Sequence, residues 1–304
     1  MKKIILTVLS ALAIISAVVI FKNLYSCNIP IGNRGIKSAL DQGELNTLFI
    51  GSSTFRSNLD ILQLDEAYDE KTYIISYGGN QYTATSIQYD EIRKRSTHKC
   101  KLMIFELDPL MLTEEVRLSD SRVIWDLSFD GKIALWNKLK DAGNNDFSIM
   151  YEYFITSGMD DLITYPITEK FYSTRYYKGA KTDETPSSGL DYLENEEFDI
   201  SDSVLIEEQL ESVKEIILKC RKDNQDFIFL ECPHYYRLED DPKYTEYHDY
   251  FTNLMKEYDV KCIYAHDIDF DNHNPEYFED MGHFSATGRQ VYTKKLIENL
   301  KGYL

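Results

Sequence analysis

The stretch LFIGSST, residues 48–54, joins a short apolar run to a turn of small polar residues. Such a run, followed at once by glycine and two serines, is typical of a buried parallel strand that ends at the carboxyl edge of a sheet. Four more apolar runs follow along the chain, at 73–75, 102–105, 227–230 and 260–264. The clearest helical patterns lie at about 204–222 and 286–301. The alternation predicts an α/β fold, a three-layer α/β/α sandwich around a parallel, flavodoxin-like sheet.

The first residues have the pattern of an N-terminal transmembrane helix. Lys2 and Lys3 precede the uncharged run 4–21, whose 18 residues are just long enough to cross a bilayer core. Because positive residues stay on the cytoplasmic side, we expect a single-pass protein of the cell membrane whose remaining chain is extracytoplasmic. Two alternatives stay open, a cleaved signal peptide and a lipoprotein cleaved before Cys27, and both also export the domain.

The composition divides the chain into three parts. Residues 1–26 form the anchor or signal segment, and residues 27–43, with Asn, Pro, Gly and Lys, form a tether. Residues 44–304 form one α/β domain. Within that domain, the stretch at about 110–200 has both tryptophans, many acids and no clear strand, which indicates an insertion beside the strand ends.

Charge and composition exclude several functions. The 304 residues carry a formal net charge of −18, so the protein repels phosphate polyanions and offers no basic surface for nucleic acid. The five cysteines have no C-x-x-C spacing, which predicts small buried side chains and neither a disulfide framework nor a zinc site. The acidic run 266–273 contains histidine but lacks the glycine and terminal glutamate of a calcium loop. We therefore expect a solvated loop there, with no metal and no cofactor.

Two separated motifs carry residues suited to acyl chemistry. Ser53 stands on the turn after the first strand, where the start of a helix supplies backbone N–H groups for an oxyanion. Near the end of the chain, Asp280 precedes His283 by three residues, just before the last helix. A serine nucleophile needs an imidazole to accept its proton and a carboxylate to orient that imidazole. Either motif alone is also an ordinary loop or a chance spacing; together, at opposite ends of the domain, they predict a catalytic triad of Ser53, His283 and Asp280.

Together these motifs resemble those of the SGNH (GDSL-type) hydrolase family. In that family a G-D-S-x block follows the first strand and a D-x-x-H block precedes the last helix. Residues 51–54 match the first block with Ser52 in place of the aspartate, which puts the nucleophile at Ser53. Residues 280–283 match the other block in full.

The same resemblance implies an oxyanion hole formed by the backbone N–H groups of Ser53 and Gly79. Gly78 and Asn80 are alternatives to Gly79 in the family's second block. The third block of the family would add an Asn side chain after the third strand. This sequence has Asp108 near that place, so the expected side-chain donor is missing.

The anchor, the serine block and the late D-x-x-H block also resemble DltD-type proteins, which work beside membrane-bound O-acyltransferases. This implies an extracytoplasmic serine acyltransferase or esterase that acts on O-acyl groups of cell-wall polymers or exopolysaccharides through an acyl-enzyme on Ser53. The implied partners are an acylated polysaccharide, teichoic acid or lipid substrate and a membrane-bound O-acyltransferase. Two alternatives stay open, a plain carbohydrate or lipid esterase and a catalytically silent accessory subunit of such an acyltransferase.

Two further charged residues have two interpretations each. Arg56, close to the predicted nucleophile, either pairs with an anionic group of the substrate or pairs with a local carboxylate. His234, after the fourth strand, either faces the site or has a structural role.

Overall fold

The computed structural model describes residues 2–30, 33–69, 71–118, 120–157 and 175–303. Its centre is a parallel sheet with the strand order β2-β1-β3-β6-β7. The strands are β1 (Thr47–Gly51), β2 (Thr72–Ser76), β3 (Leu102–Leu107), β6 (Phe227–Glu231) and β7 (Cys262–Ile263). This is the flavodoxin-like order, because β2 lies on one side of β1 and all later strands of the sheet lie on the other. The predicted fold class is therefore confirmed.

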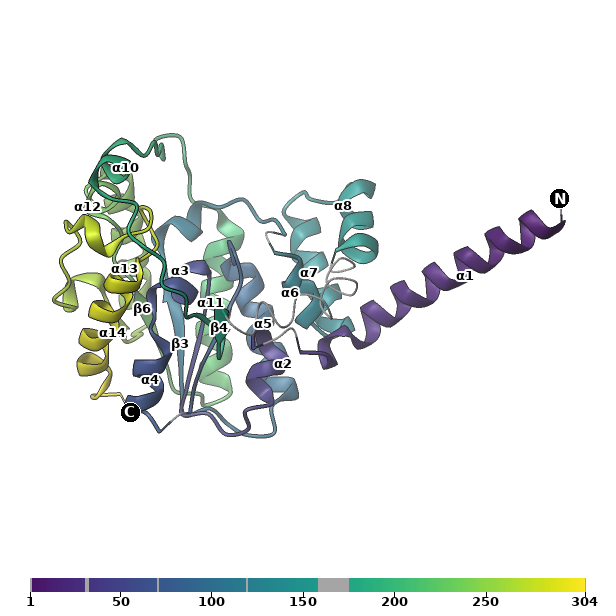
Figure 1. Ribbon diagram of the computed structural model, residues 1–304, viewed down its shortest axis with the longest axis horizontal. Coiled ribbons are helices and arrows are strands. Elements are labelled where there is room, and N and C mark those ends of the chain that lie inside the picture. The colour runs from purple at the N-terminus through teal and green to yellow at the C-terminus, as the bar shows by residue number, and fades with distance from the viewer. Residues whose placement is uncertain (1, 31–32, 70, 119, 158–174, 304) are drawn as a thin grey trace.

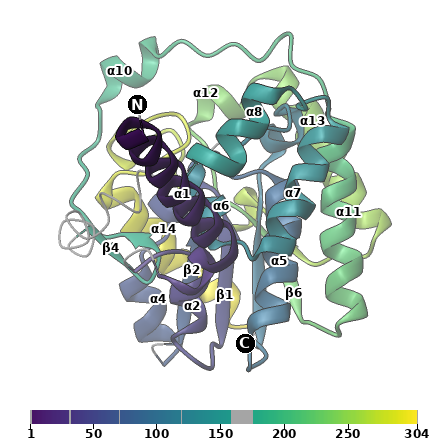
Figure 2. The ribbon, with the colours of Figure 1, turned by 90° about the vertical axis from the view of Figure 1, so that its right-hand side faces the viewer.

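Alternate residues of each strand face opposite layers of helices. In β1, Leu48 and Ile50 pack into one core, whereas Phe49 packs into the other. The helices that pack on the first core include α5 (Tyr82–Arg95), α11 (Glu207–Lys222) and α13 (Pro242–Glu257). Those on the second core include α3 (Ser53–Asn58), α4 (Ile61–Ala67) and α14 (Ala286–Leu300). Figure 2 shows the layers, with α5 and α11 on one side of the strands and α4 and α14 on the other.

The strand order fixes where a site can form. The chain leaves β1 toward β2 in one direction and then crosses to β3 in the other, so the carboxyl ends of β1 and β3 border the topological switch point. In open α/β sheets, ligands bind in the crevice outside this point. Helix α3, which begins at Ser53, starts there.

Helix α1 (Lys2–Tyr25) projects away from the α/β domain (Figure 1). The segment Ile4–Asn28 has a mean hydropathy of 2.9 over its best 18-residue window, and none of that window is buried in the protein. By length and composition, this helix can cross a membrane. A signal sequence near an N-terminus has the same properties.

The segment expected to be a tether, 27–43, is packed against the domain. It includes the end of a 3₁₀ turn, η1 (Ser26–Asn28), and helix α2 (Gly35–Leu40), in which Ile36 and Ala39 are buried. Helix α2 contacts β2, α5 and α6 (Ser121–Asp126), so it is packed on the domain. In its described part, the segment that joins α1 to the sheet is therefore folded.

The expected insertion at about 110–200 is mainly helical in its described part. It contains η2 (Pro109–Thr113), α6 (Ser121–Asp126), α7 (Phe129–Asp141), α8 (Phe147–Tyr151), a π-helical turn η3 (Glu152–Thr156) and α10 (Leu190–Asn195). It also contains a short antiparallel pair that the sequence did not predict, β4 (Tyr176–Tyr177) and β5 (Ala180–Lys181). The Ile74 N–H of β2 donates to the carbonyl of Lys178 between them, at 2.9 Å, so this hairpin covers the outer edge of the sheet. The remaining short elements are α12 (Tyr236–Glu239), η4 (Ala265–Asp267) and η5 (Pro275–Tyr277).

Candidate active site

Ser53 is the first residue of α3 and follows the carboxyl end of β1. The preceding Ser52 caps this helix, because its Oγ accepts the N–H of Thr54 at 3.1 Å. Ser52 also donates its backbone N–H and its hydroxyl to the buried Glu106 carboxylate, with 3.0 Å between Ser52 Oγ and Glu106 Oε1. The Ser52 hydroxyl is therefore directed into the protein, and Ser53 is the serine that faces the His283 ring.

The structure brings the three predicted triad residues into one hydrogen-bonded chain. His283 Nε2 lies 2.9 Å from Ser53 Oγ, and His283 Nδ1 lies 2.8 Å from Asp280 Oδ2. Ser53 and His283 are 230 residues apart in the sequence. The His283 and Asp280 side chains remain about one-third exposed, at 29% and 34%, so a substrate can reach them from solvent.

The carboxylate of Asp280 is held in its ionised form. Burial acts to raise its pKa, but the hydrogen bond and charge of the His283 ring and the N–H groups of Gly282 and His283 outweigh this effect and hold the pKa below its usual range. Asp280 Oδ1 accepts those two N–H groups at 2.9 and 2.8 Å. A fixed carboxylate at Nδ1 keeps the proton of a neutral imidazole on that nitrogen and leaves Nε2 as the acceptor that faces Ser53.

Asn58 fixes the histidine loop to the serine helix. Its side chain is fully buried, its Nδ2 donates to the Gly282 carbonyl at 2.9 Å, and its Oδ1 accepts the Phe284 N–H at 2.8 Å. These two bonds bracket His283 on both sides. Asn58 was not predicted from the sequence. The feature that pointed to it there is a polar residue directly before the apolar Leu59.

The predicted oxyanion donors have different surroundings. Within the described ranges, the Ser53 N–H has no hydrogen-bond acceptor, and it lies at the start of a helix, where the backbone dipole favours negative charge. The Gly78 N–H donates to Asp120 Oδ2 at 2.9 Å, and the Asn80 N–H donates to the Tyr77 carbonyl at 3.3 Å. Gly79 has a φ of +59°, which glycine adopts easily in the turn after β2. Its role as the second donor stays a prediction.

An ion pair occupies the place of the missing third-block donor. Asp108 Oδ1 accepts the Leu110 N–H at 2.9 Å and lies 3.7 Å from His234 Nε2. His234 is buried, which alone would lower its pKa, but Asp108 and then Glu239 and Glu231 raise the pKa to about 9. At neutral pH this histidine is therefore a cation held by Asp108.

Glu106, below the nucleophile turn, is a second residue that the sequence analysis missed. Its side chain is 2% exposed, and burial, followed by the charge of Asp108, raises the pKa of its carboxyl to about 8. A Cβ on Gly51 would come within 2.4 Å of Glu106 Oε2, so a glycine is required for this close approach. The available signal was a charged residue at the end of an otherwise apolar strand.

The described residues include no group of three or more His, Cys, Asp or Glu side chains placed to hold a metal ion. In the run 266–273, His266 is exposed and lies 3.8 Å from the neighbouring Asp267. Around Ser53 the described side chains supply a hydroxyl, an imidazole and a carboxylate.

Comparisons with known proteins give only distant similarities. No family model matches the chain, and no curated protein matches it. Among solved structures, a Streptococcus pneumonia protein named for platelet activating factor is 13% identical, with a TM-score of 0.44 and coverage of 97% of this chain and 98% of that one. A GDSL-like lipase from Bacteroides thetaiotaomicron is 10% identical, with a TM-score of 0.39 and coverage of 87% and 90%.

A mutant of an acetyl-xylooligosaccharide esterase from Geobacillus is also 10% identical, with a TM-score of 0.38 and coverage of 84% and 93%. These TM-scores are low. The fold assignment therefore rests on the strand order and the layers of helices described above.

Proposed function

We propose that this protein is a serine esterase or O-acyltransferase of the SGNH type. The observation that carries the proposal is the chain of hydrogen bonds from Ser53 Oγ through His283 to Asp280 at the carboxyl end of β1. These distances are those of a nucleophile, its general base and the carboxylate that orients the base. The resemblance of the two sequence blocks to the SGNH family supports the same function.

The geometry gives each residue a definite step. The Ser53 hydroxyl oxygen attacks the carbonyl carbon of an ester, while its proton moves to His283 Nε2. The tetrahedral oxyanion that forms accepts hydrogen bonds from backbone N–H groups, for which we propose Ser53 and Gly79. When the intermediate collapses, the alcohol leaves with the proton from His283, and the acyl group stays on Ser53.

The acyl-enzyme then reacts in one of two ways. If water attacks, with His283 again taking the proton, the cycle is ester hydrolysis. If a hydroxyl of a polymer attacks, the same steps transfer the acyl group to that polymer. We propose the second, extracytoplasmic course on cell-wall polymers or exopolysaccharides, beside a membrane-bound O-acyltransferase, because the membrane-compatible helix α1 and the DltD-like motif layout support it.

A fluorophosphonate probe tests the nucleophile directly, because it reacts covalently with an activated serine. The full chain in detergent should be labelled, and Ser53→Ala should abolish labelling. Ser52→Ala and Ser57→Ala, which remove hydroxyls from the cap and the same helix, should keep most of it, with circular dichroism to verify folding. A folded wild-type chain that takes no label would instead support the catalytically silent subunit.

Mass spectrometry of envelope polymers separates transfer from hydrolysis. In a strain that lacks this protein, O-acyl groups should be lost from the acceptor polymer if the protein transfers them. They should increase if the protein removes them, which would support the plain esterase.

A further inference from the structure

Arg56 carries a positive charge that the described protein does not compensate. It lies on α3, one helical turn after Ser53, and is only partly exposed. Among the described residues its guanidinium makes no hydrogen bond and no ion pair, and the charges that act to raise its pKa are those of Tyr176 and then Asp120. Removing a cation from water without a partner costs free energy, so partly buried cations are usually paired with an anion. Burial, followed by the charge of Arg122, lowers the pKa of Arg56 accordingly.

The carboxylate that acts on Arg56, Asp120, is already engaged by another arginine. Arg122 Nε lies 2.8 Å from Asp120 Oδ1 and 3.0 Å from Oδ2, and Arg122 Nη2 also binds Oδ2. The backbone N–H groups of Arg122 and Gly78 occupy the same two oxygens at 3.0 and 2.9 Å. Because these donors use both carboxylate oxygens, the Asp120–Arg122 pair is complete and leaves the charge of Arg56 unbalanced.

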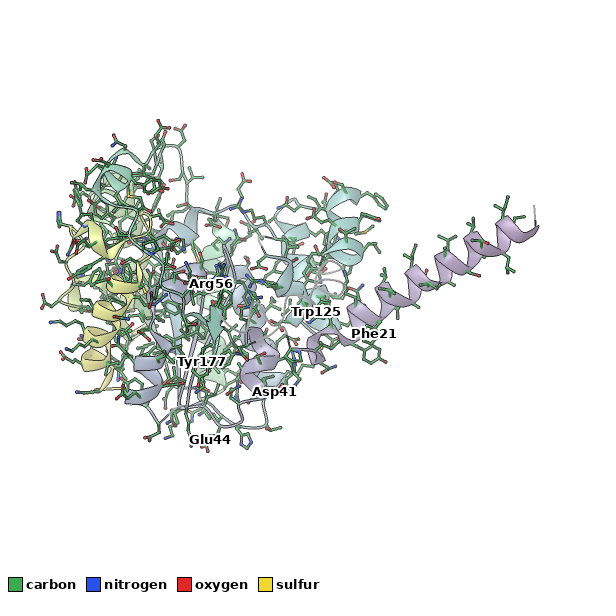
Figure 3. The ribbon with its side chains drawn as sticks, viewed as in Figure 1. Phe21, Asp41, Glu44, Arg56, Trp125 and Tyr177 are labelled. Atoms are coloured by element: carbon green, nitrogen blue, oxygen red, sulfur yellow. The ribbon has the colours of Figure 1, made fainter. Side chains whose placement is uncertain are left out.

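The position of Arg56 directs this charge toward the nucleophile. Residues three apart on a helix lie on the same face, with about 5–6 Å between their Cβ atoms. Helical side chains also lean toward the N-terminus of their helix, and the N-terminus of α3 is Ser53. Figure 3 shows Arg56 in the body of the domain, whereas Glu44 lies at its lower edge.

We propose that Arg56 binds an anionic group, a phosphate or a carboxylate, that the ester substrate carries close to its scissile bond. This inference rests on the proposed function and adds the substrate class. A guanidinium forms paired hydrogen bonds with both kinds of anion. The net charge of −18 repels anionic substrates from the protein as a whole. The positive charge of Arg56 near the nucleophile attracts them locally.

Binding of this kind has a kinetic signature. The anionic group takes no part in the bond that breaks, so Arg56 contacts it equally in the ground state and the transition state. Loss of Arg56 should therefore raise KM for anionic esters and leave kcat nearly unchanged. A residue that supports the fold alone would affect neutral and anionic esters alike.

The test uses the full chain in detergent with matched acetate esters. The anionic probes are 3-acetoxybenzoate and 3-acetoxyphenyl phosphate, and the neutral probe is methyl 3-acetoxybenzoate. Arg56→Gln should lower kcat/KM for an anionic probe by about 10- to 100-fold and leave the neutral probe unchanged. Arg56→Lys should restore part of this loss, because it keeps the charge without the paired geometry.

Arg93→Gln is the matched control, because it removes one positive charge from a partly buried arginine on α5, where Arg93 already pairs with Asp223. It should leave all probes unchanged. An effect of Arg56→Gln on only one anionic probe would identify the group as carboxylate or phosphate. Equal effects on anionic and neutral probes, or no effect on either, would overturn the proposal.

A binding measurement keeps this proposal separate from the proposed function. If the wild-type chain hydrolyses none of the three esters, the esterase function fails, and calorimetry with 3-hydroxybenzoate and phenyl phosphate still tests Arg56. The wild-type chain should then bind one of these anions at least about tenfold more tightly than Arg56→Gln. Equal binding, or none, would refute the anion site.

Discussion

Two adjacent serines at the end of β1 have different partners, and this difference selects the proposed nucleophile. Ser52 gives its hydroxyl and its N–H to the buried Glu106, and its oxygen caps α3. Ser53 gives its hydroxyl to the His283 ring. Because the Ser52 hydroxyl bonds to Glu106 and caps α3, removing it should change the stability of the protein. Removing the Ser53 hydroxyl should instead change the rate of the catalysed reaction.

Asp280→Asn tests the orienting carboxylate. The amide keeps the shape but removes the charge that stabilises the imidazolium, and in a serine protease such a change costs about 10⁴-fold in turnover. We expect a loss of at least about 100-fold in kcat for ester hydrolysis, with a folded protein. Because the pKa of Asp280 lies below its usual range, its contribution to stability is present above the unfolded value and is lost as pH falls through the folded value.

The wild-type chain should therefore lose stability relative to Asp280→Asn only in strong acid, as followed by thermal unfolding against pH. A folded Asp280→Asn protein with full activity would show that Asp280 does not orient His283.

At the scale of elements, α1 is fixed to the domain by polar contacts at its C-terminal end. Lys132 of α7 is fully buried, and its Nζ donates to the carbonyls of Lys22 and Asn23 at 3.1 Å each and to Ser26 Oγ at 2.9 Å. The last carbonyls of a helix have no partner within the helix, and a lysine satisfies them well. In return, Lys22 Nζ donates to the Ser157 carbonyl at 2.9 Å. The orientation of α1 relative to the domain is thus determined by the insertion.

Lys132→Met should weaken this attachment. The change leaves three buried acceptors without their donor, which costs about 1–3 kcal/mol. We expect a lower melting temperature for the full chain in detergent and faster proteolysis near the base of α1. Lys140→Met, an exposed position on the same helix, is the control and should change stability by less than about 0.5 kcal/mol. An unchanged melting temperature for Lys132→Met would show that these contacts do not hold α1.

At the scale of the whole molecule, the membrane-compatible helix and the candidate active site belong to one connected body. Helix α1 projects from the domain near α6 and α7 (Figure 1), while Ser53 lies at the carboxyl end of β1. Because the base of α1 is docked on the insertion, a membrane around α1 would set the orientation of the candidate active site.

Protease treatment of intact protoplasts tests the topology. If α1 crosses the membrane with Lys2 and Lys3 inside, added protease should degrade the domain while a cytoplasmic marker protein stays intact. Permeabilised cells should lose both proteins. Protection of the domain until permeabilisation would place it in the cytoplasm and rule out an envelope substrate.

The sequence by itself determined the features that depend on local patterns. Apolar runs such as 48–50 and 102–105 specify strands because burial on both faces needs continuous apolar residues, and the fold class follows from their alternation with helices. The uncharged run 4–21 likewise specifies a helix long enough to cross a membrane. The sequence also named Ser53, Asp280 and His283, because each stands at a turn where the chemistry of a triad requires it.

The contacts between polar groups that are far apart in the chain depend on the fold and could not be predicted from local patterns. Asn58 bonds to the histidine loop 224 and 226 residues away, and Lys132 bonds to the end of α1 more than 100 residues away. The same holds for Asp108, which lies near His234 where an amide was expected, and for Arg56, which forms no ion pair with any carboxylate in the described part of the chain. The type of a polar side chain in the sequence indicates which kinds of group it can bind. Its actual partner depends on how elements that are far apart in the chain pack together.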